Sequence, residues 1–321
     1  MKYIDVFNGD ADGICALHQL RLEQPHPDSR LITGVKRDIT LLDRLTDVGN
    51  ATITVLDISL DRNRDSLQRI LAHNNIVFYV DHHYAGDLPC SDNFTAHIDP
   101  DPLTCTSLLI NRLLHDSFAA WAVVGAFGDN LDESALQLAQ RLGLHTQETE
   151  RLKETGILLN YNGYGAQLDD LFFAPAELFQ KVHSYTDPLI FYAESETLQT
   201  LRKGYRDDMQ QAQSFAPVFE NSSGRIFQLP PEPWARRVAG VFSNTLARQK
   251  PALAHALLTA NNDGTLRVSV RAPLQNRIGA DTLCRQFPTG GGRSAAAGIN
   301  ALPAEQLDIF SQAFSHHFTK A

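Results

Sequence analysis

The sequence has few cysteines and no long hydrophobic run. Its four cysteines, at positions 15, 90, 105 and 284, are far apart and form no Cys-x-x-Cys pair, which argues against a disulfide framework or a zinc knuckle. No run reaches the roughly 18 consecutive apolar residues of a membrane-spanning helix. The first residues, MKYIDVFNGD, also lack the basic and apolar regions of a signal peptide. We therefore expect a cytoplasmic protein with no membrane partner.

Basic residues are in deficit as well. The chain has 28 Lys and Arg against 37 Asp and Glu, for a formal net charge of −9. Enzymes that hold long nucleic acids by electrostatic attraction present a basic groove. The charge balance therefore argues against long nucleic acid as a partner. It leaves room for a short anionic ligand held by a local positive pocket.

The remaining composition is that of a folded α/β protein. Hydrophobic residues make up 43% of the 321 residues, and at roughly 150 residues per domain this length predicts about two domains. Short apolar runs alternate with helical patterns over about the first 130 residues, which predicts a mostly parallel sheet covered by helices on both faces. The strand candidates there are residues 3–7, 31–35, 53–58 and 76–80.

A second, smaller α/β domain is predicted towards the C-terminus. Helical patterns dominate from residue 104 to about residue 185, and strand-like patterns return from about residue 225. We expect the first domain over residues 1–190, a connecting helix over 191–219 and the second domain over 220–321.

Two acidic residues follow the first predicted strand. Asp10 and Asp12 lie in the loop Asn8–Gly13, and ligand sites of open α/β sheets lie outside the carboxyl ends of strands. Two neighbouring carboxylates repel each other unless a cation lies between them. The alternative is an Asp-rich turn that caps the next helix.

Carboxylates and imidazoles recur after later apolar runs. An unpartnered carboxylate at the end of a buried strand is costly, so its repetition needs a cause. Carboxylate and imidazole ligands suit Mn²⁺ or Mg²⁺ better than a metal that prefers thiolates. Paired ions about 3.5–4 Å apart stabilise both the attacking and the leaving oxygen in phosphoryl hydrolysis. Ligands for two ions with a bridging carboxylate are available at Asp10, Asp12, Asp57, His82 and Asp129.

A glycine-rich segment in the second domain is a candidate anion site. Gly290, Gly291 and Gly292 precede Arg293 and a run of small residues that we interpret as the start of a helix. Backbone N–H groups at such a start bind anions, and an arginine adds a bidentate phosphate donor. Arg271, after a strand candidate, is a second possible anion contact. The alternative is a flexible loop followed by a tightly packed helix.

These motifs together carry a family resemblance. Asn8-x-Asp10-x-Asp12-Gly13, Asp57, Asp81-His82-His83 and Asp129, in this order, resemble the motifs of the DHH phosphoesterase superfamily. The segment 290–298 resembles the GGGHxxAAG motif of its DHHA1 companion domain. The resemblance covers roughly residues 1–185 and 220–321. It implies a DHH domain with a mostly parallel sheet, a smaller α/β DHHA1-like domain, and an active site in the cleft between them.

The resemblance also implies roles. Two Mn²⁺ ions, replaceable by Mg²⁺ or Co²⁺, would be held by Asp10, Asp12, Asp57, His82 and Asp129. Asp57 would bridge them and help to hold the water that becomes the nucleophile. His83 would lie beside the scissile phosphate, and Asp81 would orient the histidines. Arg293 and the three glycines would hold a substrate phosphate.

The chain departs from the family pattern at two positions. Asn8 stands where many members have His or Asp, which leaves its contribution as a ligand open. Arg293 stands where the family usually has His; because arginine keeps its proton near neutral pH, phosphate binding is favoured there over general-acid catalysis. We interpret Lys36 and Arg37, which follow a strand candidate, as a surface basic pair.

The superfamily acts on several substrates. The acidic charge disfavours its long-strand exonucleases, and no membrane or sensory segment precedes the first motif, unlike in the membrane-bound cyclic-dinucleotide enzymes. We expect the nanoRNase, or oligoribonuclease-like, branch, which hydrolyses short 5′-phosphorylated RNA such as the linear dinucleotide pGpG to mononucleotides. A phosphatase on a nucleoside bisphosphate such as pAp, a cyclic-dinucleotide phosphodiesterase and a non-catalytic nucleotide-binding regulator remain as alternatives. The sequence leaves base preference and a homodimer open.

Overall fold

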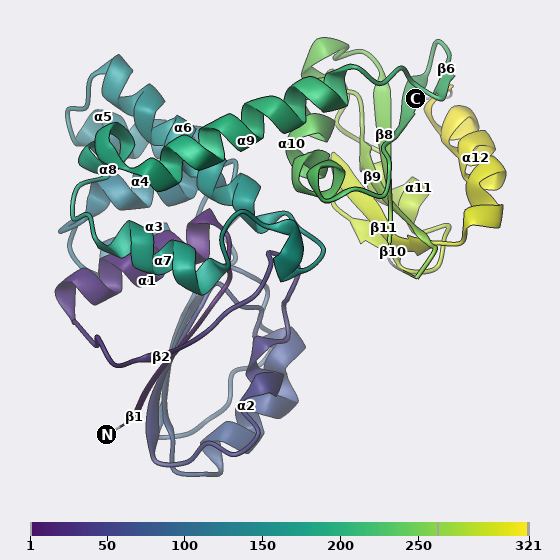
Figure 1. Cartoon of the computed structure of the whole chain (residues 1–321). Coiled ribbons are helices and arrows are strands. Elements are labelled where there is room, and N and C mark those ends of the chain that lie inside the picture. Colours follow the sequence, from purple (N-terminus) through teal and green to yellow (C-terminus); the bar gives the residue numbers. More distant parts are fainter. Residues whose placement is uncertain (1, 262, 320–321) are drawn as a thin grey trace. The chain divides into compact units, whose positions relative to one another are not determined.

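The computed structural model describes residues 2–261 and 263–319. It divides into two compact units, Met1–Arg202 and Lys203–Ala321, and the division falls inside helix α9 (Glu196–Gln213). That helix lies within the segment 191–219, for which the sequence predicts a connecting helix. Figure 1 colours both units along the chain.

The first unit is built on a five-stranded sheet in the order β2-β1-β3-β4-β5, and every neighbouring pair is parallel. This confirms the predicted mostly parallel sheet. Strands β1, β3 and β4 are buried over most of their length, because helices cover both faces, and so they appear in the sequence as apolar runs. The edge strand β5 alternates half-buried and exposed residues and was not among the strand candidates. The strands are β1 (Lys2–Phe7), β2 (Arg30–Ile32), β3 (Ala51–Leu56), β4 (Ile76–Asp81) and β5 (Phe94–Ile98).

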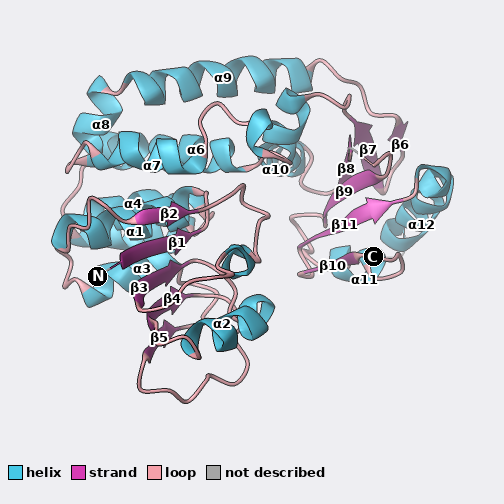
Figure 2. Cartoon of the chain, turned by 60° about the horizontal axis from the view of Figure 1, so that its bottom comes forward, coloured by secondary structure: helices cyan, strands magenta, loops and turns pink. Residues whose placement is uncertain are grey.

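Helices cover the two faces of this sheet unequally (Figure 2). Ile4 and Val6 of β1 pack with Leu67 and Ile70 of α2 on one face. The opposite face carries Phe7, which contacts Phe179 of α7, and the longer helices gather there around α1 and α4. The helices of this unit are α1 (Ala11–Glu23), α2 (Arg64–Leu71), α3 (Thr106–Leu113), α4 (Ala119–Gly128), α5 (Asp132–Arg141), α6 (Thr146–Gly163), α7 (Pro175–His183) and α8 (Pro188–Glu194), with 3₁₀ turns at Leu41–Arg44, Asp61–Asn63 and Leu168–Asp170.

Helix α4 lies at the centre of the helical layer. Nearly all of its residues are buried, and it packs against α1 and α6. Close approach requires glycine at two of its contacts: a Cβ on Gly128 would lie 2.3 Å from the Ala11 Cβ, and one on Gly156 of α6 would lie 2.3 Å from the Val124 carbonyl oxygen. This packing brings the C-terminal end of α4 close to the N-terminal end of α1. Within the described residues, no helix combines the length and the apolar character needed to cross a membrane.

The second unit contains a mixed six-stranded sheet in the order β10-β11-β9-β8-β7-β6. Strands β7 and β8 are parallel and the other pairs are antiparallel. Phe310 and Phe314 of α12 pack with the strands and α11 in a hydrophobic core, and α10 packs on β8 and β9. The elements are β6 (Phe219–Glu220), β7 (Gly224–Gln228), α10 (Pro233–Gln249), β8 (Ala254–Ala260), β9 (Leu266–Arg271), α11 (Ala280–Cys284), β10 (Gly290–Gly292), β11 (Ala296–Leu302), a 3₁₀ turn (Ala304–Gln306) and α12 (Leu307–Thr319).

The prediction of a helix after the three glycines is wrong. Residues 290–292 form β10 and residues 296–302 form β11, so the segment is a β-hairpin. Small residues such as Ala296 and Ala297 favour a helix in isolation, but β11 is paired on both sides, with β10 and β9. Tertiary pairing therefore overrides local propensity in this segment.

Candidate metal centre

Asp10 and Asp12 lie where β1 passes into α1, at the carboxyl edge of the parallel sheet. Asp10 is the N-cap residue of α1, and its side chain accepts a hydrogen bond from the Gly13 backbone N–H at 3.1 Å. A Cβ on Gly13 would lie 2.2 Å from the Asn8 carbonyl oxygen, so this turn requires glycine. Asp10 therefore caps the helix, as one interpretation of the sequence held, and its second oxygen faces other groups of the site.

Asp12 is held by the N-terminus of α3. Its two carboxylate oxygens accept hydrogen bonds from the backbone N–H groups of Thr106 at 2.8 Å and Ser107 at 2.7 Å. The N-terminal end of a helix carries a partial positive charge that stabilises a carboxylate. Because both oxygens are tied to the backbone, the orientation of Asp12 is fixed before any ligand binds.

Asp57 follows β3 in a left-handed backbone conformation, with φ at 58°. Non-glycine residues adopt this conformation rarely, and such strain gathers at functional sites. Its side chain is only 3% exposed and accepts a hydrogen bond from the Thr106 hydroxyl at 3.3 Å. The strained turn points the Asp57 carboxylate into the cluster formed by Asp10 and Asp12.

The Asp81-His82-His83 triplet follows from the end of β4. His82 Nε2 lies 3.4 Å from Asp57 Oδ1 and 3.8 Å from Asp129 Oδ2. Asp81 is fully buried and lies 2.7 Å from His83 Nδ1, while the His83 side chain is 44% exposed. Asp81 therefore orients His83, and the carboxylates of the cluster orient His82.

Asp129 reaches the site from a helix, within the region 104–185 where the sequence predicts helices. It is the residue that ends α4, where it makes a backbone hydrogen bond to Gly125. The C-terminal end of a helix carries a partial negative charge, which disfavours a carboxylate. Asp129 is thus placed where its charge is costly without a cation nearby.

Lys36 belongs to this cluster, so its interpretation as part of a surface pair is wrong. Its Nζ forms an ion pair with Asp10, lies 3.4 Å from Asp129 Oδ1, and donates to Asn160 Oδ1 at 3.1 Å. The reasoning that selected the acidic residues also applied to Lys36, because it follows β2 at the same sheet edge. Asn160, near the C-terminal end of α6, carried no comparable signal in the sequence.

The electrostatics of the cluster reflect crowding of like charge. Burial, followed by repulsion from Asp12 and Asp10, raises the pKa of Asp57 well above its usual value. Burial acts to lower the pKa of His82, but its hydrogen bond and charge interaction with Asp57 raise it to about 10. Without a metal ion, the Asp57–His82 pair therefore holds a proton that a cation would displace.

Asp10 differs from Asp57 because Lys36 neutralises it. Burial acts to raise the pKa of Asp10, yet the Lys36 ammonium holds it below its usual value. Burial likewise acts to lower the pKa of Lys36, and the charges of Asp10 and Asp129 raise it well above the usual value. The Asp10 side of the cluster is thus compensated by the protein itself.

The donor set fits a divalent cation. One ligand atom each from Asp12, His82 and Asp129 lie within 4.8 Å of one another, and the same holds for Asp57, His82 and His83. Oxygen and imidazole ligands suit Mn²⁺ or Mg²⁺. Asp10 belongs to neither group of three. Among the described residues, four carboxylates of the cluster face the ammonium of Lys36 and the imidazole of His82, which leaves an excess of negative charge for a metal to balance.

Asn8 offers the cluster no charged ligand atom. Its side-chain amide donates to the Lys36 carbonyl oxygen at 3.2 Å, while its buried Oδ1 has no hydrogen-bond partner among the described residues. Asn8 therefore supports the backbone that carries Lys36 and retains one neutral acceptor.

The glycine hairpin of the second unit presents Arg293 at its turn. Arg293 and Ala296 close the turn with reciprocal backbone hydrogen bonds of 2.9 and 3.1 Å. The Arg293 side chain is exposed and has no ion pair or side-chain hydrogen bond within residues 2–261 and 263–319. Arg271, at the end of β9, is instead held by Asn244 Oδ1 at 2.8 Å and Ser269 Oγ at 3.0 Å.

The three glycines of β10 differ in whether the fold requires glycine at their position. A Cβ on Gly290 would lie 1.8 Å from the Cys284 carbonyl oxygen, and Gly292 has a φ of 138°. Gly291 has open space where a Cβ would be. Packing and backbone conformation therefore explain Gly290 and Gly292, but they do not explain Gly291.

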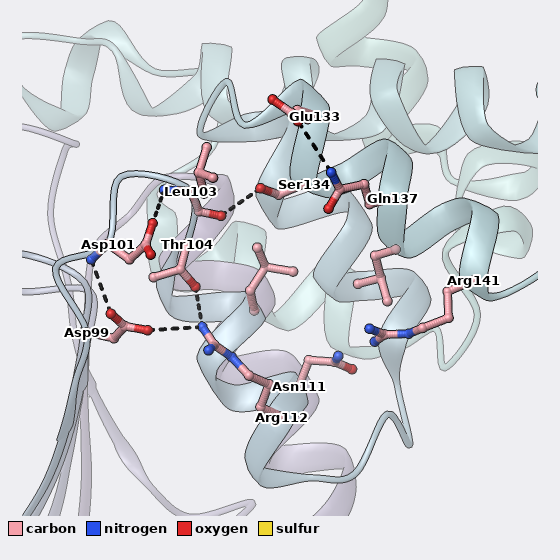
Figure 3. A pocket seen from close by; sticks show the side chains of 12 residues that line it. Asp99, Asp101, Leu103, Thr104, Asn111, Arg112, Glu133, Ser134, Gln137 and Arg141 are labelled. Atoms are coloured by element: carbon pink, nitrogen blue, oxygen red, sulfur yellow. Dashed lines mark hydrogen bonds and ion pairs between the residues drawn. The ribbon is translucent and has the colours of Figure 1, made fainter.

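A separate polar pocket lies between α3, α5 and the loop before α3 (Figure 3). Its arginines are already paired: Arg112 lies 3.4 Å from Asp99, and Arg141 lies 3.0 Å from Asp116. None of the predicted metal ligands lines it. The pocket therefore adds no group to the candidate metal centre.

No protein-family model matches the sequence, and no curated protein matches it either. Solved structures do match over nearly the whole chain. The exonuclease RecJ bound to manganese aligns with a TM-score of 0.62 at 15% identity, covering 100% of this chain and 91% of that one. A DHH-domain protein described as a member of a family of ribosomal proteins aligns with a TM-score of 0.62 at 14% identity, covering 98% and 86%.

A third match is the pGpG-specific phosphodiesterase PggH from Vibrio cholerae. It aligns with a TM-score of 0.54 at 13% identity, and 99% of each chain is covered. At these identities the likeness establishes the fold. The chain has the α/β fold of DHH-domain proteins, as the motif order predicted.

Proposed function

We propose that the chain is a metal-dependent phosphodiesterase that hydrolyses short linear oligonucleotides, in particular 5′-phosphorylated dinucleotides of the pGpG type, to mononucleotides. The observation that carries this proposal is the convergence of Asp12, Asp57, His82 and Asp129 at the carboxyl edge of a DHH-type sheet. Ligand sites of open α/β sheets lie at this edge.

We propose Mn²⁺ as the metal, with Mg²⁺ or Co²⁺ as substitutes. Asp12, Asp57, His82 and Asp129 would hold it; the resemblance implies two ions, with Asp57 between them. A bound divalent cation polarises a phosphoryl oxygen and lowers the pKa of a water ligand. RecJ has been solved with Mn²⁺ and with Mg²⁺, which supports a divalent ion in this fold.

The side chains around the ligands have distinct tasks in this proposal. The hydrogen bonds from Thr106 and Ser107 keep the Asp12 carboxylate in place, so it does not reorganise on binding. Asp81 holds His83 Nδ1, which leaves the other ring nitrogen of this half-exposed histidine to contact a phosphate oxygen or to protonate the leaving oxygen.

We further propose that the glycine hairpin binds the terminal phosphate of the substrate. The Arg293 guanidinium, which has no side-chain partner among the described residues, offers a bidentate donor, and the open space at the Cβ position of Gly291 leaves room for an anion. Gly290, Gly292 and Arg271 support the hairpin around them. A net charge of −9 gives little electrostatic attraction for a longer strand, which favours a short substrate. PggH, of the same fold, is described as specific for pGpG.

A substrate panel tests this proposal. Purified protein with Mn²⁺ is incubated with a 5′-phosphorylated dinucleotide, a ten-residue RNA, a cyclic dinucleotide and a nucleoside bisphosphate at equal concentration, and products are separated by chromatography. We expect the dinucleotide to give two mononucleotides at the highest initial rate, and excess chelator to abolish the reaction.

The other outcomes each identify an alternative. Fastest degradation of the ten-residue RNA indicates an exonuclease, release of inorganic phosphate from the bisphosphate indicates a phosphatase, and fastest opening of the ring indicates a cyclic-dinucleotide phosphodiesterase. No turnover of any substrate supports a non-catalytic regulator. Each of these results overturns the proposed substrate.

A further inference from the structure

The cluster divides into two unequal parts. On one side, Asp12, His82 and Asp129 offer ligand atoms close enough to share one ion, with Asp57 beside His82. On the other side, Asp10 lies outside both groups of potential ligands, and its carboxylate is engaged by the Gly13 N–H and the Lys36 ammonium. Asp10, which the family resemblance includes among the ligands of the two ions, therefore already has a cation beside it.

Lys36 is built into this position. Its ammonium is anchored by three oxygens, those of Asp10, Asp129 and Asn160, and it also lies 5.7 Å from the ring centre of Tyr164. Asn160 is itself fixed, because its amide donates to the Tyr164 hydroxyl at 3.1 Å. The buried amide oxygen of Asn160, which accepts a hydrogen bond from the ammonium, indicates that Lys36 is a specific part of the site.

The alternative ligands on the Asp10 side are weak. Asn8 stands in the first motif and could offer only a neutral amide oxygen, which binds a divalent cation less strongly than a carboxylate or an imidazole. A second ion near Asp10 would also lie close to the Lys36 ammonium, and like charges at this range repel strongly. Both effects oppose a second ion at the same place.

We propose that the Lys36 ammonium acts as the internal cation of the Asp10 side, so that the centre binds one divalent ion tightly and a second ion only weakly. Lys36 then neutralises Asp10 and contributes positive charge beside the proposed metal site. This inference rests on the proposed metal-dependent function, and it changes the number of ions that the site requires.

The test counts bound metal directly. Metal-free protein is titrated with Mn²⁺, free ion is followed by its six-line electron paramagnetic resonance signal, and the parent is compared with Lys36→Met, which removes the charge and keeps the length. Lys36→Gln is a second, polar variant. Lys181→Met, which removes a half-buried lysine of the same unit that is paired with Glu177, is the charge-matched control. Thermal unfolding verifies that each variant is folded.

For the parent and Lys181→Met we expect one equivalent of Mn²⁺ to bind tightly. The dissociation constant of the second ion should be at least roughly tenfold higher. Loss of the Lys36 charge should strengthen the second ion at least tenfold, about 1.4 kcal/mol, and produce an exchange-coupled signal from two neighbouring ions. Two equally tight ions in the parent, or unchanged binding in both Lys36 variants, overturn the inference. Two tight ions with normal turnover leave the proposed function standing, whereas no Mn²⁺ binding by any variant refutes both. If Lys36→Met does not fold, Lys36→Gln and the count in the parent decide.

Discussion

The two units present their candidate functional groups in opposite ways. In the first unit, carboxylates are buried at a sheet edge, and backbone N–H groups, Thr106, His82 and Lys36 hold them. In the second unit, Arg293 is exposed at a hairpin turn with no side-chain partner among the described residues. Buried charge must be compensated within the fold or by a ligand, whereas an exposed arginine costs nothing when it is unused. The first site is therefore the stronger evidence for function.

The largest expected effect is the loss of turnover on substitution of Asp57, a position at which function and stability can be separated. Asp57→Asn keeps the size of the side chain, and asparagine tolerates the left-handed backbone at this position. We expect Mn²⁺-dependent turnover to fall on the order of 10³-fold, because a bound metal supplies several kcal/mol of transition-state stabilisation. The metal-free variant should be at least as stable as the parent, because one of three mutually repelling carboxylates has become neutral.

Turnover and urea unfolding in chelator measure the two effects. Asp57→Ala is the matched comparison: alanine is strained at this φ, by roughly 1–2 kcal/mol, so it should be less stable than Asp57→Asn at similar loss of turnover. Retained turnover in Asp57→Asn would remove this residue from the metal site. A large loss of stability in the same variant would show that its charge serves folding.

A second prediction contrasts the response of the two units to metal and pH. The pKa of His82 is raised to about 10 in the metal-free fold, against about 6.5 when unfolded. Its contribution to stability is therefore complete below about pH 6.5 and is lost as the pH rises towards 10. The raised pKa of Asp57 acts in the same direction, because the unfolded carboxyl releases its proton at lower pH.

Mn²⁺ should reverse this dependence. Metal binds the deprotonated ligands, so the stability that it adds to the first unit should be larger at about pH 8.5 than at about pH 6, reaching about 2.7 kcal/mol when free metal is 100 times Kd. The unfolding transition of the second unit should not move. Calorimetry in the presence of Mn²⁺ provides the measurement, and Ca²⁺, which this donor set should bind more weakly, is the comparison ion. Equal increments at both pH values would mean that no proton is displaced from the cluster.

The third prediction tests whether the exposed arginine has a function. Arg293→Ala should weaken substrate binding by about 2 kcal/mol, or roughly 30-fold in KM, which is typical of a charge-assisted hydrogen bond. Arg293→Lys should recover only part of it, because lysine cannot bind bidentately. Mn²⁺ binding should stay unchanged, and Arg285→Ala, at another exposed arginine of this unit, serves as the control. Equal kinetic constants in all four proteins would make the hairpin purely structural.

The difference between the units also explains what the sequence could predict. Apolar runs that end in Asp57 and in Asp81-His82-His83 indicated a sheet edge, because such residues are costly in a core without a cause, and the structure brings them together. Asp129 follows an apolar run that forms the buried helix α4, and a buried helix is as apolar as a buried strand. Lys36 was missed because its partners, Asp10, Asp129 and Asn160, come from three other elements of the fold. The hairpin at 290–298 was misassigned because its pairing with β9 depends on residues far away in the chain.

The smallest expected effect is the one that best separates structure from function in the hairpin. Gly291 has open space at the Cβ position, so Gly291→Ala should leave the free energy of unfolding unchanged, while Gly290→Ala should destabilise the second unit because its Cβ would overlap the Cys284 carbonyl oxygen. If a substrate phosphate approaches the Gly291 backbone, the added methyl group will hinder it. We then expect KM to rise about fivefold, close to 1 kcal/mol, with kcat and Mn²⁺ binding unaffected.

Initial rates at several dinucleotide concentrations give KM, and thermal unfolding gives the stability of each variant. An unchanged KM in a folded Gly291→Ala protein would limit the anion site to the Arg293 side chain, and a loss of stability in that variant would show that Gly291, like its two neighbours, is required by the fold.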